Sequence, residues 1–398
     1  MTAAGSSAAP THLPRGHLRA LQGVNLVSSL DRSAIAPMLL VIAADLDVSV
    51  AEMAVAASLY YFTYGLGQPV WGLVSARLGT VRTLRLALGG AAAAGLLSAL
   101  SPNLVVFALL RCMAGGFFGG AIPATLVYVG ATVPVEERQQ PVTDLMAGVA
   151  VGMAAATVAA GWTAQLLTWR VMFAVTAAAA AGLTLYLRRV PEPPAAPIEG
   201  HPLRALGRAT ADRWVLLVLL FAFVEGAALT GTFTFVAPGI QEATGAGAGL
   251  AGTVVAVYGI AVLLFSRVVR PLSARLRTPT LLLVGGTAGV LGFAVLALQR
   301  SFLTGVVACV LLGAAWAFMH STLQTWATSV APQARAQVVP LFAACLFLGG
   351  STGAWLGGLL AANDLYGLLF GLSAVVFMPL TLGTATARHR YLRVRRGR

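Results

Sequence analysis

Twelve long apolar runs, joined by short polar loops, limit the possible folds of this chain more than any other feature. A bilayer core is ~30 Å thick and a helix rises ~1.5 Å per residue, so about 20 apolar residues span it. Of the 398 residues, 58% are hydrophobic and 10% charged, which excludes a soluble domain. We expect membrane spans near residues 18–44, 53–75, 83–100, 103–131, 141–168, 170–187, 214–238, 247–270, 279–298, 302–330, 336–361 and 364–385.

The polar interval 188–213 divides these spans into two sets of six. It contains Pro191-Glu192-Pro193-Pro194 and several arginines, a composition typical of a solvated linker. A short repeat supports the division, because GLVSARL at 72–78, after the second span, recurs as RPLSARL at 270–276, after the eighth. We predict an all-α membrane protein with an N-terminal tail (1–17), two pseudo-symmetric six-helix halves (18–187 and 214–385), the cytoplasmic linker (188–213) and a basic C-terminal tail (386–398).

The distribution of arginine predicts the orientation. All 26 basic residues are Arg, and all but Arg32, Arg111, Arg170 and Arg300 fall on one side of the predicted membrane. By the positive-inside rule, both termini and the linker are cytoplasmic in a multi-pass protein of the cell inner (plasma) membrane. Residues 1–17 have no signal-peptide pattern, so the first span is its own insertion signal. The basic C-terminal tail favours contact with anionic membrane lipids over nucleic acid.

Four charged residues lie inside the spans, near mid-membrane: Asp31, Arg32, Arg111 and Glu225. Each such charge costs ~2.5–3.5 kcal/mol on insertion scales, so it normally faces a cavity or a partner. Their charges sum to zero, as expected if they converge on one cavity. They are either static pairs that fix the helices, or a site where one carboxylate takes up and releases a proton. We predict Glu225 as the proton carrier and Asp31 with Arg111 as the more permanent pair; Arg32 with Glu225 is the alternative pairing.

His320 is the remaining titratable residue in a span, either as a hydrogen-bonded structural histidine or as a charge partner in the cavity. Aromatic residues near the span centres suit a lipophilic or weakly cationic substrate better than a sugar or phosphate. The three cysteines lie in apolar runs and form no metal-binding pattern, so we expect no metal or cofactor. The residues predicted to line the substrate cavity are Phe117, Phe118, Tyr64, Phe223, Phe233 and Trp316.

Several segments together resemble the major facilitator superfamily, and within it the drug:proton antiporter-like branch with twelve spans. The loop GLVSARLGTVR at 72–82 resembles the signature that follows helix 2, and LLRCMAG at 109–115 resembles the helix 4 motif with an intramembrane Arg. Helix 5, from Gly148 to Gly161, is similar to the glycine-rich antiporter motif, and DRSAIAPML at 31–39 to the acidic opening of helix 1. The resemblance implies two six-helix halves that alternate access to a central site.

The same resemblance assigns conformational roles to two groups of residues. These are Gly72, Arg77, Gly79 and Arg82 in the loop and Gly148, Gly152 and Gly161 in helix 5. The chain departs from the family pattern at three positions. Ala76 and Ala131 stand where the family often has Asp, and Thr157 stands where the antiporter motif has Pro.

The leading functional interpretation is a secondary transporter that exports small hydrophobic or weakly cationic compounds in exchange for protons. The alternatives are a proton-coupled uptake permease or facilitator for a small metabolite, and a non-transporting membrane sensor or assembly partner. The composition argues against an ATP-driven pump, because the chain has no Lys for a phosphate-binding loop. No enzyme-like set of Ser, His and Asp is recognisable, so we expect no catalytic activity. We expect a monomer, with a small-molecule substrate, protons and lipids as its partners.

Overall fold

The computed structural model describes residues 14–193, 207 and 211–396, and every regular element in them is a helix. The bounds agree closely with the twelve predicted spans. The N-terminal half contains α1 (Arg15–Asp45), α2 (Val50–Leu78), α3 (Thr80–Ala99), α4 (Leu104–Phe118), α5 (Ala121–Thr132), α6 (Gln139–Leu166) and α7 (Trp169–Tyr186). The C-terminal half contains α9 (Arg213–Glu225), α10 (Val236–Thr244), α11 (Ala248–Arg275), α12 (Thr278–Leu298), α13 (Phe302–Ala315), α14 (Ser321–Val330), α15 (Arg335–Ala361) and α16 (Tyr366–Arg396).

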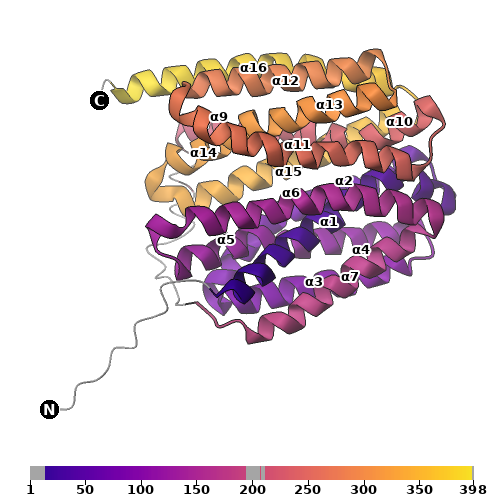
Figure 1. Cartoon of the computed structure of the whole chain (residues 1–398), viewed down its shortest axis with the longest axis horizontal. Coiled ribbons are helices and arrows are strands. Elements are labelled where there is room, and N and C mark those ends of the chain that lie inside the picture. The colour runs from indigo at the N-terminus through magenta and orange to yellow at the C-terminus, as the bar shows by residue number, and fades with distance from the viewer. Residues whose placement is uncertain (1–13, 194–206, 208–210, 397–398) are drawn as a thin grey trace.

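The helices run side by side along one axis, and the start of α1 and the end of α16, the terminal helices of the chain, lie at the same end of the bundle (Figure 1). Ten helical segments in the described residues are long and apolar enough to cross a membrane. The 29-residue α2 and the 20-residue α3 complete twelve crossings. The predicted all-α fold with twelve transmembrane helices is therefore present.

Two segments differ from the predicted tails and linker. Helix α16 continues to Arg396, well past the predicted span end at residue 385, so most of the basic tail is helical. The first part of the linker packs against the bundle, since Val190 and Pro193 are buried, and a 3-10 turn covers Leu187–Arg189. The linker residues 194–206 and 208–210 lie outside the described part of the chain, as do 1–13 of the N-terminal tail.

Two helix pairs join the halves: α2 packs on α15, and α6 packs on α11. At the end of the bundle away from the termini, the Gln241 amide donates to Pro37 O at 3.3 Å, and Gln165 Oε1 accepts from Gly249 N at 2.9 Å. Near the same end Trp162 Nε1 donates to Thr253 Oγ1 at 3.1 Å. These hydrogen bonds hold the two halves together on that side.

Three crossings are interrupted near their middle. Between α4 and α5, a side chain on Gly119 would come within 2.6 Å of Tyr64 O, so the close approach of α2 requires glycine there. Between α9 and α10 the chain forms a π-helical segment (Gly226–Gly231), and between α13 and α14 another (Trp316–His320). π-Helical turns inside α-helices occur frequently at functional sites.

Candidate functional site

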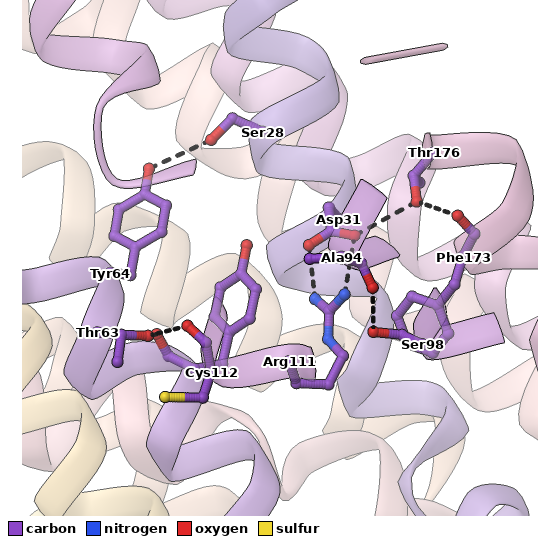
Figure 2. A network of polar contacts seen from close by, with 11 residues as sticks. Ser28, Asp31, Thr63, Tyr64, Ala94, Ser98, Arg111, Cys112, Phe173 and Thr176 are labelled. Atoms are coloured by element: carbon purple, nitrogen blue, oxygen red, sulfur yellow. Dashed lines mark hydrogen bonds and ion pairs between the residues drawn. The ribbon is translucent and has the colours of Figure 1, made fainter. Parts of the chain in front are cut away.

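Asp31 of α1 and Arg111 of α4 form a fully buried ion pair in the N-terminal half (Figure 2). Arg111 Nη2 lies 2.5 Å from Asp31 Oδ2 and Nη1 lies 3.2 Å from Oδ1, so the contact is bidentate. Each side chain is 1% exposed. Thr176 Oγ1 of α7 lies 3.3 Å from Asp31 Oδ1 and 2.9 Å from Phe173 O, and shares its single proton between these acceptors. The pairing expected from the sequence is present, and its role in coupling stays a prediction.

Two aromatic rings enclose the guanidinium of this pair. Arg111 Cζ lies 4.7 Å from the centre of the Tyr60 ring and 4.5 Å from that of Phe173. Such cation–π contacts contribute ~0.5–2 kcal/mol, more when desolvated. Arg111 Nε has no hydrogen-bond partner. The N-terminal pair is thus held from α1, α2, α4 and α7 at once, which fixes its geometry.

Glu225 and His320 form a second buried pair, in the C-terminal half. Glu225 Oε2 lies 3.2 Å from His320 Nδ1, and the two side chains are 0% and 8% exposed. The second carboxylate oxygen, Oε1, has no hydrogen-bond partner. The Trp316 ring stacks on the imidazole with centres 3.8 Å apart and planes at 19°. One face of the histidine is therefore covered, and one oxygen of the carboxylate is left without a donor.

The two pairs occupy equivalent helices of the two halves. Asp31 lies on the first crossing and Arg111 on the fourth, whereas Glu225 lies on the seventh and His320 on the tenth. Glu225 is the last residue of α9, directly before the π-helical segment Gly226–Gly231, and His320 ends the other π-helical segment. The C-terminal pair thus lies where both of its helices depart from regular geometry.

The four intramembrane charges do not form the single cluster that their net charge of zero led us to expect. Glu225 contacts His320, not Arg32, because the seventh and tenth crossings are neighbours within one half. The guanidinium of Arg32 lies instead over two rings, 5.3 Å from the centre of Tyr64 and 5.2 Å from that of Phe347. The alternative pairing of Arg32 with Glu225 is therefore absent from this structure.

The predicted cavity residues separate into three environments. Phe117 lies against Trp71 and Gly90 of the N-terminal half, and Phe118, the next residue of α4, is 1% exposed. Tyr64 lies between the halves, with ring centres 4.5 Å from Phe347 of α15. The remaining three belong to the C-terminal half: Phe223 is half-buried on α9, Phe233 lies 4.2 Å from Tyr258, and Trp316 covers His320.

The loop between α2 and α3 is held by Glu192, which lies just after the sixth crossing. Glu192 Oε1 accepts from Val81 N at 2.8 Å and Oε2 from Arg82 N at 3.2 Å, so the carboxylate caps the N-terminus of α3. Gly79 has φ +92°, and a side chain there would meet the Glu192 carboxyl. Gly72 has open space around it, and the side chain of Arg77 is exposed.

The glycines of α6 serve two different contacts. Side chains on Gly148 and Gly152 would meet the backbone of α1 at Gln22 and Leu26, within the N-terminal half. A side chain on Gly161 would meet the backbone of Ala248 on α11, across the two halves. Only the last contact lies where the halves would move against each other. No group of three or more metal-ligating side chains gathers in the residues that the structure describes.

With this geometry in place, comparison with known proteins identifies the family. The Major Facilitator Superfamily model matches residues 23–354 and also residues 222–393. The chain belongs to this superfamily. It is accordingly a membrane transporter with a small-molecule substrate and not an enzyme. Among curated proteins, the uncharacterized MFS-type transporter YfhI of Bacillus subtilis (strain 168) is 23% identical over 342 residues, covering 84% of each chain.

Solved structures of the superfamily share the fold at low sequence identity. The nucleoside transporter NupG has a TM-score of 0.73 at 15% identity over 92% of this chain and 98% of that one. A bacterial homolog of the human lysosomal transporter Spinster, inward-facing and unoccupied, has a TM-score of 0.74 at 16% identity, covering 94% and 97%. A D-xylose–proton symporter has a TM-score of 0.73 at 16% identity, covering 91% and 96%. These similarities establish the superfamily fold.

Some residues of the site were not found by sequence reasoning. The contact of His320 with Glu225, the ring of Phe347 and the cap formed by Glu192 were all missed. A signal existed for the first of them. In pseudo-symmetric halves, helix 7 corresponds to helix 1 and helix 10 to helix 4. Asp31 on helix 1 pairs with a basic residue on helix 4, so Glu225 on helix 7 should pair with a basic residue on helix 10. His320 is the titratable residue of that helix.

Proposed function

We propose that the protein is a proton-coupled secondary transporter of the drug:proton antiporter type, which exports small apolar compounds by alternating access. The observation that carries the proposal is the buried contact between Glu225 and His320. A carboxylate and an imidazole are the two side chains able to exchange a proton near neutral pH. Their contact at 3.2 Å, with the other carboxylate oxygen unpartnered, is suited to holding a proton that must later be released.

In the proposed cycle, Glu225 holds the proton and His320 Nδ1 stabilises whichever form is present. When Glu225 is protonated, neutral Nδ1 accepts a hydrogen bond from the carboxyl. When Glu225 has given its proton to water, the neutral tautomer of His320 that carries its hydrogen on Nδ1 donates to the carboxylate. Glu225 releases its proton to water on the cytoplasmic side before substrate binds, and a proton from the opposite side replaces it after the halves have rocked. The π-helical segments on both helices let the two side chains shift without unwinding a regular helix.

Asp31 and Arg111 have a different role in this proposal. Arg keeps its charge throughout the accessible pH range, so a bidentate Arg–carboxylate pair is a poor place for a transferable proton. We assign this pair to fixing α1 against α4 while the C-terminal half carries the proton. Both termini are taken as cytoplasmic from the distribution of arginine, in a monomeric protein of the plasma membrane. The hydrogen bonds that join the halves then lie on the external side, as in a cytoplasm-facing state.

Uptake is the second candidate direction, because a D-xylose–proton symporter and a nucleoside transporter are among the proteins of similar fold. Export is favoured by the resemblance of helix 5 to the antiporter motif, from Gly148 to Gly161. Proton movement distinguishes the two. In an antiporter, substrate added to acidified everted vesicles releases protons from the lumen; in a symporter, flux of substrate and proton has the same direction.

The test is proton movement in everted vesicles over a panel of small aromatic compounds, neutral, anionic and cationic. Wild-type vesicles should lose luminal acid on addition of a substrate, and Glu225→Gln should abolish the response while the protein still reaches the membrane. His320→Gln should retain transport but change its pH profile. Arg188→Gln, an exposed change near the linker, is the matched control. Unchanged proton coupling in Glu225→Gln contradicts the assignment of the carrier.

A further inference from the structure

Arg32 is the charged residue, among the four inside the predicted spans, that belongs to neither of the two buried pairs. Asp31 contacts Arg111, and Glu225 contacts His320. In the part of the chain that the structure describes, no carboxylate oxygen lies within 4.0 Å of the Arg32 guanidinium. An uncompensated charge at this depth costs ~2.5–3.5 kcal/mol on insertion scales and is by default a functional feature.

The surroundings of Arg32 satisfy only part of its guanidinium. Nη1 donates to Tyr64 Oη at 3.4 Å. That hydroxyl also lies 3.4 Å from Ser28 Oγ, a contact drawn in Figure 2. A guanidinium has about five N–H donors, so most of them remain available to another acceptor. The side chain is half-buried, unlike Asp31 and Arg111, which are 1% exposed. The donors of Arg32 therefore lie at an accessible position.

The position of Arg32 is the junction between the two halves. Tyr64 belongs to α2 in the N-terminal half and Phe347 to α15 in the C-terminal half, and Arg32 Cζ lies over both rings. Tyr61 extends the same aromatic surface, because its ring stacks on Phe347 with centres 6.3 Å apart. The hydroxyl of Tyr61 also lies 3.4 Å from Thr234 Oγ1, across the halves. A cation next to a cluster of aromatic rings thus lies where the two halves meet, and the rings of Tyr61, Tyr64 and Phe347 are covered in this structure, at 7%, 0% and 7% exposure.

We propose that Arg32 is an anion-binding residue and that the transported compounds are aromatic or otherwise apolar carboxylic acids in their ionised form. The carboxylate binds the free N–H donors of Arg32, and the apolar part of the ligand packs on Tyr64, Phe347 and Tyr61 when the two halves separate and uncover these rings. Charge-assisted bonds from Arg to carboxylate are among the strongest hydrogen bonds in proteins. A cationic substrate is repelled by the same residue, so this inference replaces the weak cations expected from the sequence.

The inference deepens the proposed function and rests on it for transport, but its test requires only binding. Full-length protein purified in detergent is titrated with three probes of nearly equal shape: 2-naphthoate, 2-naphthamide and 2-naphthylmethylammonium. Quenching of tryptophan fluorescence reports binding at neutral pH. Wild-type protein should bind the carboxylate about tenfold or more tightly than the amide, because one charge-assisted contact is lost in the amide. The ammonium probe should bind most weakly of the three.

Variants separate this inference from the proton-coupling proposal. Arg32→Gln should remove the preference for carboxylate over amide, Arg32→Lys should retain part of it, and Arg188→Gln should leave it unchanged. Phe347→Leu should weaken the carboxylate and the amide alike, because it reduces the aromatic surface and keeps the charge. Glu225→Gln should keep the charge preference in binding even where it abolishes proton movement. Equal affinity for carboxylate and amide, or an unchanged preference in Arg32→Gln, would overturn the proposal.

Discussion

Replacing Asp31 by Asn should be among the most destabilising single changes in the chain. The substitution keeps the side-chain volume but leaves the Arg111 guanidinium without a counter-charge at a site that is 1% exposed. Arg111 already has one unpartnered nitrogen, Nε, and an amide oxygen replaces two charged contacts with one neutral contact. Arg cannot lose its proton to escape the cost. We therefore expect a loss of about 3–5 kcal/mol in the free energy of unfolding.

The reverse change, Arg111→Gln, should cost less. The carboxyl of Asp31 still lies beside Thr176 and can become neutral by binding a proton, which a guanidinium cannot do by losing one. We expect a cost of about 1–3 kcal/mol, the range for a buried group that loses a hydrogen-bond partner. The double change Asp31→Asn with Arg111→Gln places two neutral amides opposite each other. It should be more stable than Asp31→Asn alone, so the two single costs should not add.

Equilibrium unfolding in mixed detergent and SDS micelles, followed by the fluorescence of the seven tryptophans, measures these differences. Asp45→Asn is the matched control, because Asp45 also contacts an arginine, Arg170, but the side chains are 44% and 35% exposed. Exposed pairs contribute about 0–1 kcal/mol. The reasoning is refuted if Asp31→Asn costs no more than Asp45→Asn, or if the costs of the single changes add in the double variant.

Three further predictions follow from particular contacts. Glu192→Ala should destabilise the start of α3 by about 0.5–2 kcal/mol, because it removes the cap from the Val81 amide, and hydrogen exchange there should accelerate while exchange in α7 stays unchanged. Gly161→Val should prevent close packing on Ala248 and open the end of the bundle away from the termini; unchanged access of thiol reagents to cysteines introduced there would contradict this. Cys309, fully buried, should react with maleimide more slowly than the other two cysteines, and equal rates would show that α13 is less tightly packed than described.

The number and length of the crossings could be predicted from the sequence because a bilayer imposes one length on every apolar helix. The contact between Asp31 and Arg111 could also be predicted, since a charge inside the membrane usually faces a partner or a cavity and not lipid. The interruptions of the helices near mid-membrane could not be predicted from the sequence. Gly226 and Gly231 look like ordinary packing glycines in sequence, and their π-helical geometry depends on how closely α15 approaches, with the backbones of Leu346 and Ala354 where side chains would be.

The cavity residues were difficult to predict for a different reason. Several crossings are apolar on every side, so the sequence carries little information about which face of the helix meets which neighbour. Phe117 and Phe118 are adjacent on α4, and Phe117 packs against Trp71 within the N-terminal half, whereas Phe118 is buried. Phe347 was missed although it contacts Arg32, since one phenylalanine in an apolar helix has no distinguishing pattern. Contacts across the halves are set by tertiary packing and not by local sequence.

The two buried pairs differ in ways that suit them to different roles in the proposed transport cycle, although they lie on equivalent helices. Both halves place a carboxylate on their first helix and a basic side chain on their fourth, but the basic residues differ: Arg111 is a permanent cation, whereas His320 carries an imidazole, which can be neutral or charged. The Asp31 pair lies on regular helical turns, and the Glu225 pair lies at two π-helical segments. A permanent charge and a regular backbone suit a fixed support. A titratable base on an irregular backbone suits the moving part, which is why we expect proton coupling to depend on Glu225 and His320, and stability on Asp31 and Arg111.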